Sequence, residues 1–364
     1  MYIYFILFGW VLLSGAILNG RKKSNKYKKF FLGLSFSAMI LILGLRAESV
    51  GEDTKNYLYM FDRAKDVQWN DIFHEFSFRT TYFTWDYGYQ EQVETGYLIL
   101  NKFVHIFTDS GHAFLFVIAL LTCVLFAVFI YKNSNDVFLS TYIFMCETLY
   151  MFAFNGMRQA LALSIAIQAY SMIKDRKFVK AISTILLAFL IHNTAVICFA
   201  FFSIVLVKPK NETRTFKWEV VVAIMFPIVV LALRNVIAVL FPQYRLYYST
   251  NYWINSLGGS AIIWIFLVSL IFVLYLKHFP LEGTFQYATF SLVYLSLQLT
   301  GLQITVFSRL GLYFAPFLLL LYPKAILLFS AKSRRWMKLL LFALMALLFL
   351  AQVRNPSRAY SFCF

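Results

Sequence analysis

The sequence is poor in charged residues. Asp, Glu, Lys and Arg make up 14% of its 364 residues, whereas hydrophobic residues make up 61%. A soluble domain is about a quarter charged and about half apolar, so this composition excludes an ordinary soluble fold. Apolar stretches long enough to cross a bilayer recur from end to end, which indicates that lipid is the solvent for most of the chain.

Cysteine is scarce as well. Three of the four cysteines, Cys123, Cys146 and Cys198, lie inside apolar runs, which indicates neither a disulfide framework nor a metal cluster. Asp, His and Cys nowhere have the spacing of metal ligands, so we expect no metal and no other cofactor. The first twenty residues lack a basic region and a small-residue cleavage site, so no cleavable signal is expected. No internal repeat, low-complexity stretch or second domain is visible, which predicts a single transmembrane domain over residues 1–364.

Positive charge is abundant but scattered. The net charge of +16 would suit nucleic-acid binding, yet the basic residues form short clusters between apolar runs. That pattern fixes orientation in a membrane and excludes a nucleic-acid partner. The cluster at 21–29 predicts a cytoplasmic first connection, and alternation then places the clusters at 174–180, 208–217 and 332–338 inside as well.

The predicted fold is all-α and polytopic. About ten apolar runs are long enough to cross the bilayer as helices. They are 2–19, 30–46, 112–131, 138–154, 158–173, 218–240, 260–276, 284–300, 306–329 and 339–353.

A further apolar region, 181–207, is interrupted by His192-Asn193-Thr194. The basic clusters on both sides lie inside only if this region enters and leaves on the cytoplasmic side. We therefore expect a re-entrant pair of short helices, 181–191 and 194–207, with His192 at the outer turn. Such broken backbone must be buried in protein or line a wet cavity. One long tilted helix with a polar kink is the alternative.

The connection 47–111 is expected to lie outside. It contains eleven of the seventeen acidic residues. Its aromatic residues include Trp69, Tyr82, Trp85, Tyr87, Tyr89 and Tyr97. A loop of this length is usually functional, and we expect amphipathic helices on the membrane around 55–66 and 94–107. The aromatic side chains are candidates either for stacking on sugar rings or for an interfacial belt.

Several cationic or titratable side chains are predicted to lie at a similar depth, near the outer face of the membrane. They are Arg46, Arg158, His192, Arg245 and Arg309. Each arginine alone could be an anchor that snorkels to the interface. Together they are unusual, because the positive-inside rule disfavours arginine outside.

Such a cluster of cationic side chains is suited to binding an anion. Guanidinium groups bind phosphate through bidentate hydrogen bonds, and helix N-termini add backbone donors and a positive dipole end. We expect helices to begin after Asn155-Gly156, after His192-Asn193-Thr194 and at Phe307-Ser308. The sequence thus predicts an anion site at the level of lipid phosphates.

Two charged residues lie deeper in the predicted spans. Glu147 and Arg234 are each roughly 10 Å below the outer ends of their spans by helix rise. Equal depth and opposite charge favour a buried structural pair, with direct contact to substrate as the alternative.

Several segments resemble motifs of the EpsG family. Arg46 to Phe61 is similar to the signature R-x-x-x-x-G-x-D-T-x-x-Y-x-x-x-F, and Glu94-Thr95-Gly96-Tyr97 is similar to E-x-G-Y. Met157-Arg158-Gln159-Ala160-Leu161-Ala162 resembles M-R-Q-x-[LI]-A, His192-Asn193-Thr194-Ala195 resembles H-x-[ST]-A, and Ser308-Arg309-Leu310 with Tyr313 resembles R-[LI]. The resemblance runs from about residue 40 to 315, and nothing after 320 matches.

The family consists of Wzy-like polymerases that make O-antigen, capsule or exopolysaccharide in bacterial inner membranes, grouped with GT-C-type glycosyltransferases. The resemblance implies transfer of a growing glycan from undecaprenyl diphosphate to the non-reducing end of a lipid-linked repeat unit. The reaction would be metal-independent and would face the periplasm or exterior. The implied partners are the undecaprenyl diphosphate-linked oligosaccharide, membrane lipid and, where chain length is set elsewhere, a regulator protein.

The implied chemistry assigns roles to the residues singled out above. The candidates for binding the leaving diphosphate are Arg46, Arg158, Arg245 and Arg309. The candidates for catalysis are Arg158, His192, Arg309, Asp53 and Glu94. His192 would hydrogen-bond the diphosphate or move a proton. Asp53 and Glu94 are the candidates for a base, if the acceptor hydroxyl needs one.

Two other functions fit the same pattern. An O-antigen ligase would use the same donor with another acceptor, and physical arguments do not separate it from a polymerase. A lipid-linked oligosaccharide flippase would also be polytopic. Many transporters contain two similar halves, which this sequence lacks.

Overall fold

The computed structural model is mainly helical and describes residues 1–17, 24–69, 72, 81–84, 90–240 and 260–363. Within these residues four helices are long and apolar enough to cross a membrane: α2 (Asn25–Gly44), α6 (Gly111–Asn133), α13 (Glu212–Ala232) and α20 (Ala331–Val353). A fifth candidate is the pair Thr305–Gly311 and Ala315–Ile326, which is bent by 42°. The prediction of a helical membrane protein is confirmed.

The other predicted spans are also mainly helical where the structure describes them, but each is divided, shorter than 18 residues or less apolar than these four helices. Their elements are α1 (Tyr2–Ile17), α7 (Val137–Cys146), α8 (Thr148–Phe152), α9 (Met157–Ala166), α10 (Gln168–Lys174), α14 (Arg234–Leu240), α16 (Ser260–Leu276), α17 (Thr284–Gly301), α18 (Thr305–Gly311), η5 (Ala315–Phe317) and α19 (Leu318–Ile326). Glu147 explains one break, because its carboxylate accepts a hydrogen bond of 2.6 Å from Thr148 N and caps α8. In the described part of the chain, length and composition thus support four or five spans, and the remaining predicted crossings stay a prediction.

The interruption predicted within 181–207 is confirmed. Helix α11 (Phe178–Ile191) ends at His192, which is extended with φ −157° and ψ 119°. The chain resumes as a 3-10 helix, η2 (Asn193–Phe199), followed by α12 (Ala200–Leu206). The second short helix was predicted from residue 194, and its first half is a 3-10 helix.

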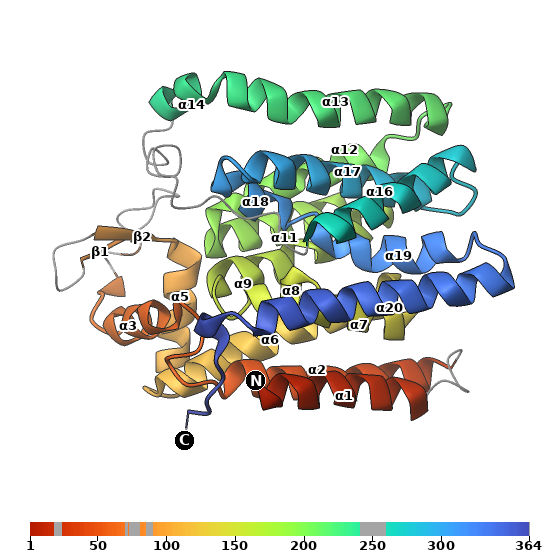
Figure 1. The fold of residues 1–364 in the computed structure, drawn as a ribbon. Coiled ribbons are helices and arrows are strands. Elements are labelled where there is room, and N and C mark those ends of the chain that lie inside the picture. Colours follow the sequence, from red (N-terminus) through yellow and green to blue (C-terminus); the bar gives the residue numbers. More distant parts are fainter. Residues whose placement is uncertain (18–23, 70–71, 73–80, 85–89, 241–259, 364) are drawn as a thin grey trace. The chain divides into compact units, whose positions relative to one another are not determined.

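The chain forms two compact units. The first contains residues 1–133, 145–199 and 350–364, and the second contains residues 134–144 and 200–349. In the first unit α1 lies beside α2, and Trp10 Nε1 donates to the Leu34 carbonyl at 3.1 Å (Figure 1). Gly44 lets α2 approach α6 closely, since a Cβ there would lie 2.8 Å from the Phe116 ring.

The described part of the connection 47–111 is folded. The two predicted helices are present as α3 (Thr54–Ala64) and α5 (Thr95–His105). Between them an antiparallel pair, β1 (Thr81–Thr84) and β2 (Gln90–Val93), departs from the all-α prediction. The apolar face of α3 packs on protein instead of lipid, because the Phe61 ring stacks on His105 and Phe114 at centroid distances of 3.9 and 4.4 Å.

The C-terminal segment pairs with the residues that follow α2. Ala47 N donates to Ser361 O at 2.9 Å, and Gly51 N donates to Ser357 O at 2.8 Å, beside the short 3-10 helix η6 (Pro356–Arg358). Cys363 N donates to the Leu45 carbonyl. Residues beyond 320, which carried no recognised motif, therefore hold the R-x-x-x-x-G-x-D-T segment in place.

The second unit is organised around α17, which packs along α13. Ser296 Oγ donates to the Ala223 carbonyl at 2.8 Å, and Thr289 Oγ1 donates to Glu219 Oε2 at 2.7 Å. These bonds satisfy polar groups inside two largely apolar helices, where an unpaired group would be costly.

Candidate functional site

A single carboxylate in the first unit collects three hydrogen-bond donors. Glu94 Oε2 accepts from Arg158 Nη1 at 3.0 Å. Its Oε1 lies 2.6 Å from His192 Nδ1 and accepts from Asn193 N at 3.3 Å. The Glu94 side chain is only 7% exposed. The sequence named Glu94, Arg158 and His192 separately, and the fold brings them into contact. We call these three residues the Glu–Arg–His cluster.

Glu94 occupies the N-cap position of α5, yet its carboxylate does not cap that helix. The side chain turns instead to Arg158 and His192. Gly96 permits this arrangement, because a Cβ there would lie 2.7 Å from the Leu190 carbonyl at the end of α11. The E-x-G-Y element therefore pairs a functional carboxylate with a close helix approach.

Arg158 lies in the first turn of α9, which begins after the Gly156 N-cap. A Cβ at Gly156 would lie 2.2 Å from the Phe152 ring, so a larger residue in this turn would have to displace that ring. The guanidinium lies over the Tyr57 and Tyr97 rings at 5.8 and 5.7 Å from their centroids. Both tyrosines are buried, and such cation–π contacts fix the orientation of a cation.

His192 projects from the break between α11 and η2. Its bond to Glu94 fixes the tautomer, because a carboxylate accepts only from a protonated Nδ1. Nε2 then carries the lone pair in the neutral ring. No described residue is hydrogen-bonded to Nε2, and the His192 side chain is 20% exposed. The cluster can thus present one proton acceptor at its surface.

The charges in the cluster stabilise one another. Burial alone would raise the pKa of Glu94, but the His192 hydrogen bond and the Arg158 charge outweigh it and lower the pKa to about 2. Glu94 is therefore ionised at neutral pH. With neutral His192 the cluster has no net charge, and it gains one positive charge when His192 takes up a proton.

Arg46 lies at the end of α2 and is buried, with 1% exposure. Its guanidinium donates to the Leu43 carbonyl and to Thr54 Oγ1, and lies 3.8 Å from Met157 Sδ. These contacts lie inside the protein, so they favour a structural role over diphosphate binding. They also connect the first EpsG-like motif to the residue that precedes Arg158.

The remaining predicted site residues lie on other elements or outside the described chain. Asp53 is the N-cap residue of α3, four residues before Tyr57. Glu147 caps α8 in the first unit, whereas Arg234 begins α14 in the second and is exposed. Arg309 lies in the last turn of α18 and is half-buried. Arg245 lies outside the described residues.

Sequence reasoning missed three parts of the site. The Asn193 backbone N–H donates to Glu94, and the Tyr57 and Tyr97 rings lie against Arg158. Tyr97 is fully buried, so it supports the guanidinium and does not stack on a sugar. Their places within the motifs were the available signal, since Tyr57 ends the first motif's D-T-x-x-Y and Tyr97 ends E-x-G-Y.

These features define a helical membrane protein with a buried carboxylate that orients a histidine and an arginine. The EpsG family model matches residues 29–363. The chain therefore belongs to the EpsG family, and the match extends well beyond the 40–315 seen from the motifs. No curated protein and no solved structure matches the chain.

Proposed function

We propose that this protein is a polysaccharide polymerase, a glycosyltransferase that lengthens a glycan carried on undecaprenyl diphosphate. Membership of the EpsG family supports the reaction class. The observation that carries the proposal is the bond of 2.6 Å between Glu94 and His192 beside Arg158. A carboxylate-oriented histidine next to an arginine suits transfer to a hydroxyl with departure of an anion.

In the proposed reaction His192 Nε2 takes the proton from the acceptor hydroxyl. The hydroxyl oxygen forms a bond to the anomeric carbon of the donor glycan. The bond from that carbon to the diphosphate oxygen breaks, and the diphosphate leaves with the electron pair. Glu94 stabilises the imidazolium that forms, as the buried carboxylate does in a catalytic triad.

Charge at the site changes in step with this transfer. When His192 becomes protonated, the Glu–Arg–His cluster gains a positive charge as negative charge develops on the diphosphate. Arg158 is the arginine best placed to stabilise that charge, because the two tyrosine rings and Glu94 hold its guanidinium in one orientation. Arg309 and Arg245 are proposed as further diphosphate ligands from motif and charge alone.

The geometry favours Glu94 as a positioning residue over a base. Three donors occupy its oxygens, and a carboxylate with a pKa of about 2 is a weak proton acceptor. Asp53 is the second candidate for a base, because it begins α3 one turn before Tyr57. No metal ion is needed in this scheme, since arginine and imidazolium supply the positive charge.

We place the reaction at the outer face of a bacterial inner membrane. The distribution of Lys and Arg supports about ten crossings with 47–111 outside and with 181–207 re-entrant around His192. A GT-C-like architecture and a separate chain-length regulator are part of this proposal. The pairing of Glu147 with Arg234 stays a prediction from their similar depth in the sequence.

The test uses purified protein in nanodiscs with a synthetic undecaprenyl diphosphate-linked repeat unit. Products of the unaltered protein, Arg158→Ala, His192→Ala and Arg63→Ala are compared on a gel. Arg63 is a matched control, because this exposed arginine also lies over a tyrosine ring, at 5.4 Å from the Tyr59 centroid.

We expect a ladder from the unaltered protein and from Arg63→Ala, and a single repeat from the other two variants. A ladder that persists in Arg158→Ala and His192→Ala would keep the polymerase and discard this site. No ladder from any variant, with matched substrate, would contradict the polymerase and direct attention to a ligase or a flippase.

A further inference from the structure

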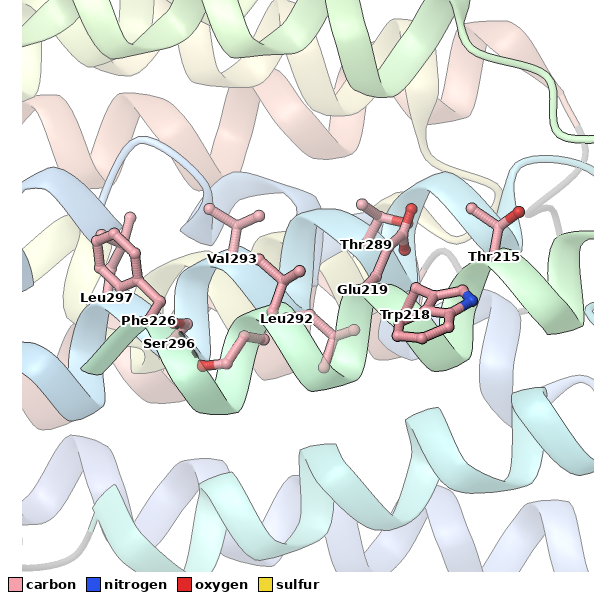
Figure 2. A pocket seen from close by; sticks show the side chains of 11 residues that line it. Thr215, Trp218, Glu219, Phe226, Thr289, Leu292, Val293, Ser296 and Leu297 are labelled. Carbon is pink, nitrogen blue, oxygen red and sulfur yellow. Dashed lines mark hydrogen bonds between the residues drawn. The ribbon is translucent and has the colours of Figure 1, made fainter. Parts of the chain in front are cut away.

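The second unit contains a groove that opens along a membrane-spanning helix. It lies between α13 and α17 and has a volume of about 350 Å³ (Figure 2). Residues 215, 218, 219, 222, 223 and 226 line it from α13 at the spacing of one helix face, and 289, 292, 293, 296 and 297 line it from α17. We call it the acyl groove. It runs for about 16 Å by helix rise.

The groove is almost entirely apolar, and its outer wall is exposed. Val222 is 64% exposed and Trp218 is 66% exposed. Only 11% of the apolar window of α13 is buried within the protein. In a membrane this surface faces hydrocarbon, so the groove is open to a lipid chain.

One polar feature lies within the groove. Thr289 Oγ1 donates to Glu219 Oε2 at 2.7 Å, and both side chains line the groove (Figure 2). Because this bond lies between the helices, it holds α13 on α17 while leaving the apolar wall continuous from Val222 to Phe226.

A second pocket lies beside the N-terminal end of α13. It has a volume of about 700 Å³ and is lined by Asn211, Thr213, Arg214, Lys217, Trp218, Val221 and His278. We call it the cationic pocket. Trp218 lines both cavities, so the cationic pocket and the apolar acyl groove adjoin at this side chain.

The charges at this end favour an anion. Arg214 and Lys217 both line the pocket, and the N-terminus of α13 adds the positive end of a helix dipole. His278 Nδ1 lies 3.1 Å from Thr213 Oγ1 across the pocket. The facing acidic groups are Glu212, which precedes the pocket in the first turn, and Glu219, which lies in the groove.

We propose that the acyl groove and the cationic pocket together bind an anionic phospholipid of the cytoplasmic leaflet. The acyl chain lies between α13 and α17, and the phosphate lies against Arg214 and Lys217. Charge complementarity selects this occupant over a neutral lipid, because the pocket that adjoins the groove is cationic. Trp218 lies at the junction, the level that tryptophan favours in a bilayer.

The experiment measures lipid retained by full-length protein in native mass spectrometry. Phosphatidylglycerol and phosphatidylcholine with identical acyl chains are compared as probes. The test variant is Arg214→Gln with Lys217→Gln. The control is Lys332→Gln with Arg335→Gln, which removes two exposed basic side chains from the start of α20.

We expect the unaltered protein and the control to retain phosphatidylglycerol in preference to phosphatidylcholine. The test variant should lose about 30-fold in this preference, because each basic residue near an anionic lipid contributes about a factor of five. Equal retention of the two lipids by the unaltered protein, or an equal loss in the control, would overturn the proposal.

A second variant tests the apolar end without changing charge. Leu292→Trp places a large ring in the acyl groove, and we expect it to lower retention of both lipids. Retention unchanged by Leu292→Trp would show that no chain occupies the groove. Soluble glycerol phosphate should not displace the lipid, and displacement at equal concentration would assign the pocket to a free phosphate. These readouts are of binding, so they are independent of polymerase activity.

Discussion

Replacing Glu94 with Gln removes the negative charge that holds two side chains of the Glu–Arg–His cluster. The amide keeps the shape of the carboxylate but offers one acceptor oxygen and an NH₂ donor. That NH₂ group must face either Arg158 or His192. Both residues already direct a donor at the side chain of residue 94, at 3.0 and 2.6 Å, so a donor would face a donor. The variant therefore leaves a buried guanidinium without its counter-charge.

The expected loss of stability can be worked out in two ways. The pKa of Glu94 falls from its usual 4.5 to about 2, which corresponds to about 3 kcal/mol in favour of the ionised form. Removing one partner of a buried ion pair costs about 3–5 kcal/mol. The two values agree, and about 3 kcal/mol corresponds to a fall of about 6–12 °C in Tm for a unit of this size.

Thermal unfolding in detergent measures this loss, with Glu48→Gln as the control. Glu48 lies in the same connection and forms an ion pair with Lys55 at 3.8 Å, but its side chain is 62% exposed. Such a surface pair contributes about 0–1 kcal/mol. A Tm for Glu94→Gln within about 2 °C of the control would refute the reasoning.

The pH dependence provides a second check. Because the pKa of Glu94 is lower in the folded than in the unfolded chain, its stabilisation is complete above about pH 4.5 and is lost as the pH falls to about 2. The Tm difference between the unaltered protein and Glu94→Gln should be constant from about pH 5 to 8 and should shrink below about pH 4.5. A difference that shrinks near pH 7 would mean that another group carries the effect.

Three further variants test particular contacts. Gly96→Ala should lower both Tm and polymer formation, because its Cβ would meet the Leu190 carbonyl at 2.7 Å. Gly51→Ala should lower the Tm in the same melting assay. Gly51 has φ +92°, and a Cβ there would lie 2.3 Å from the Phe154 carbonyl. Arg46→Lys should lower stability by about 1.5–3 kcal/mol for each charged hydrogen bond lost, while steady-state kinetics show an unchanged KM for the lipid-linked donor.

The positions of the helices could be predicted from the sequence, because each helix of a membrane protein is a continuous run of strongly hydrophobic residues. Where the structure describes them, the predicted apolar runs are mainly helical. The helix breaks at His192, where Asn193 and Thr194 interrupt the hydropathy. The break at Glu147 was not predicted. Hydropathy is similar on both sides of it, and the carboxylate ends the helix by capping the next one.

The members of the site were named from motifs, but their contacts were not. Glu94 lies 64 residues from Arg158 and 98 residues from His192 in sequence. Nothing local to Glu94 shows which cations it will meet. Its burial, and the contacts with His192 and Arg158 that lower its pKa, arise only when α5, α9 and α11 pack together.

Burial in the fold also distinguishes two arginines that looked equivalent in the sequence. Arg46 and Arg158 each follow or begin an apolar run, so the sequence placed both at the anion site. In the fold Arg46 is enclosed by protein groups, whereas Arg158 pairs with Glu94 and is 13% exposed. The C-terminal segment that pairs with residues 45–51 carries no recognisable pattern, because several of its contacts with them are backbone hydrogen bonds.

The most direct test of the central claim is a double-mutant cycle on the rate of polymer formation with Glu94→Gln and His192→Ala. Residues that act as one unit are not additive. If Glu94 acts through His192, the double variant should be about as slow as His192→Ala alone. Rate losses that multiply in the double variant would show that the two residues act independently, and would contradict a carboxylate-oriented histidine at the reaction site.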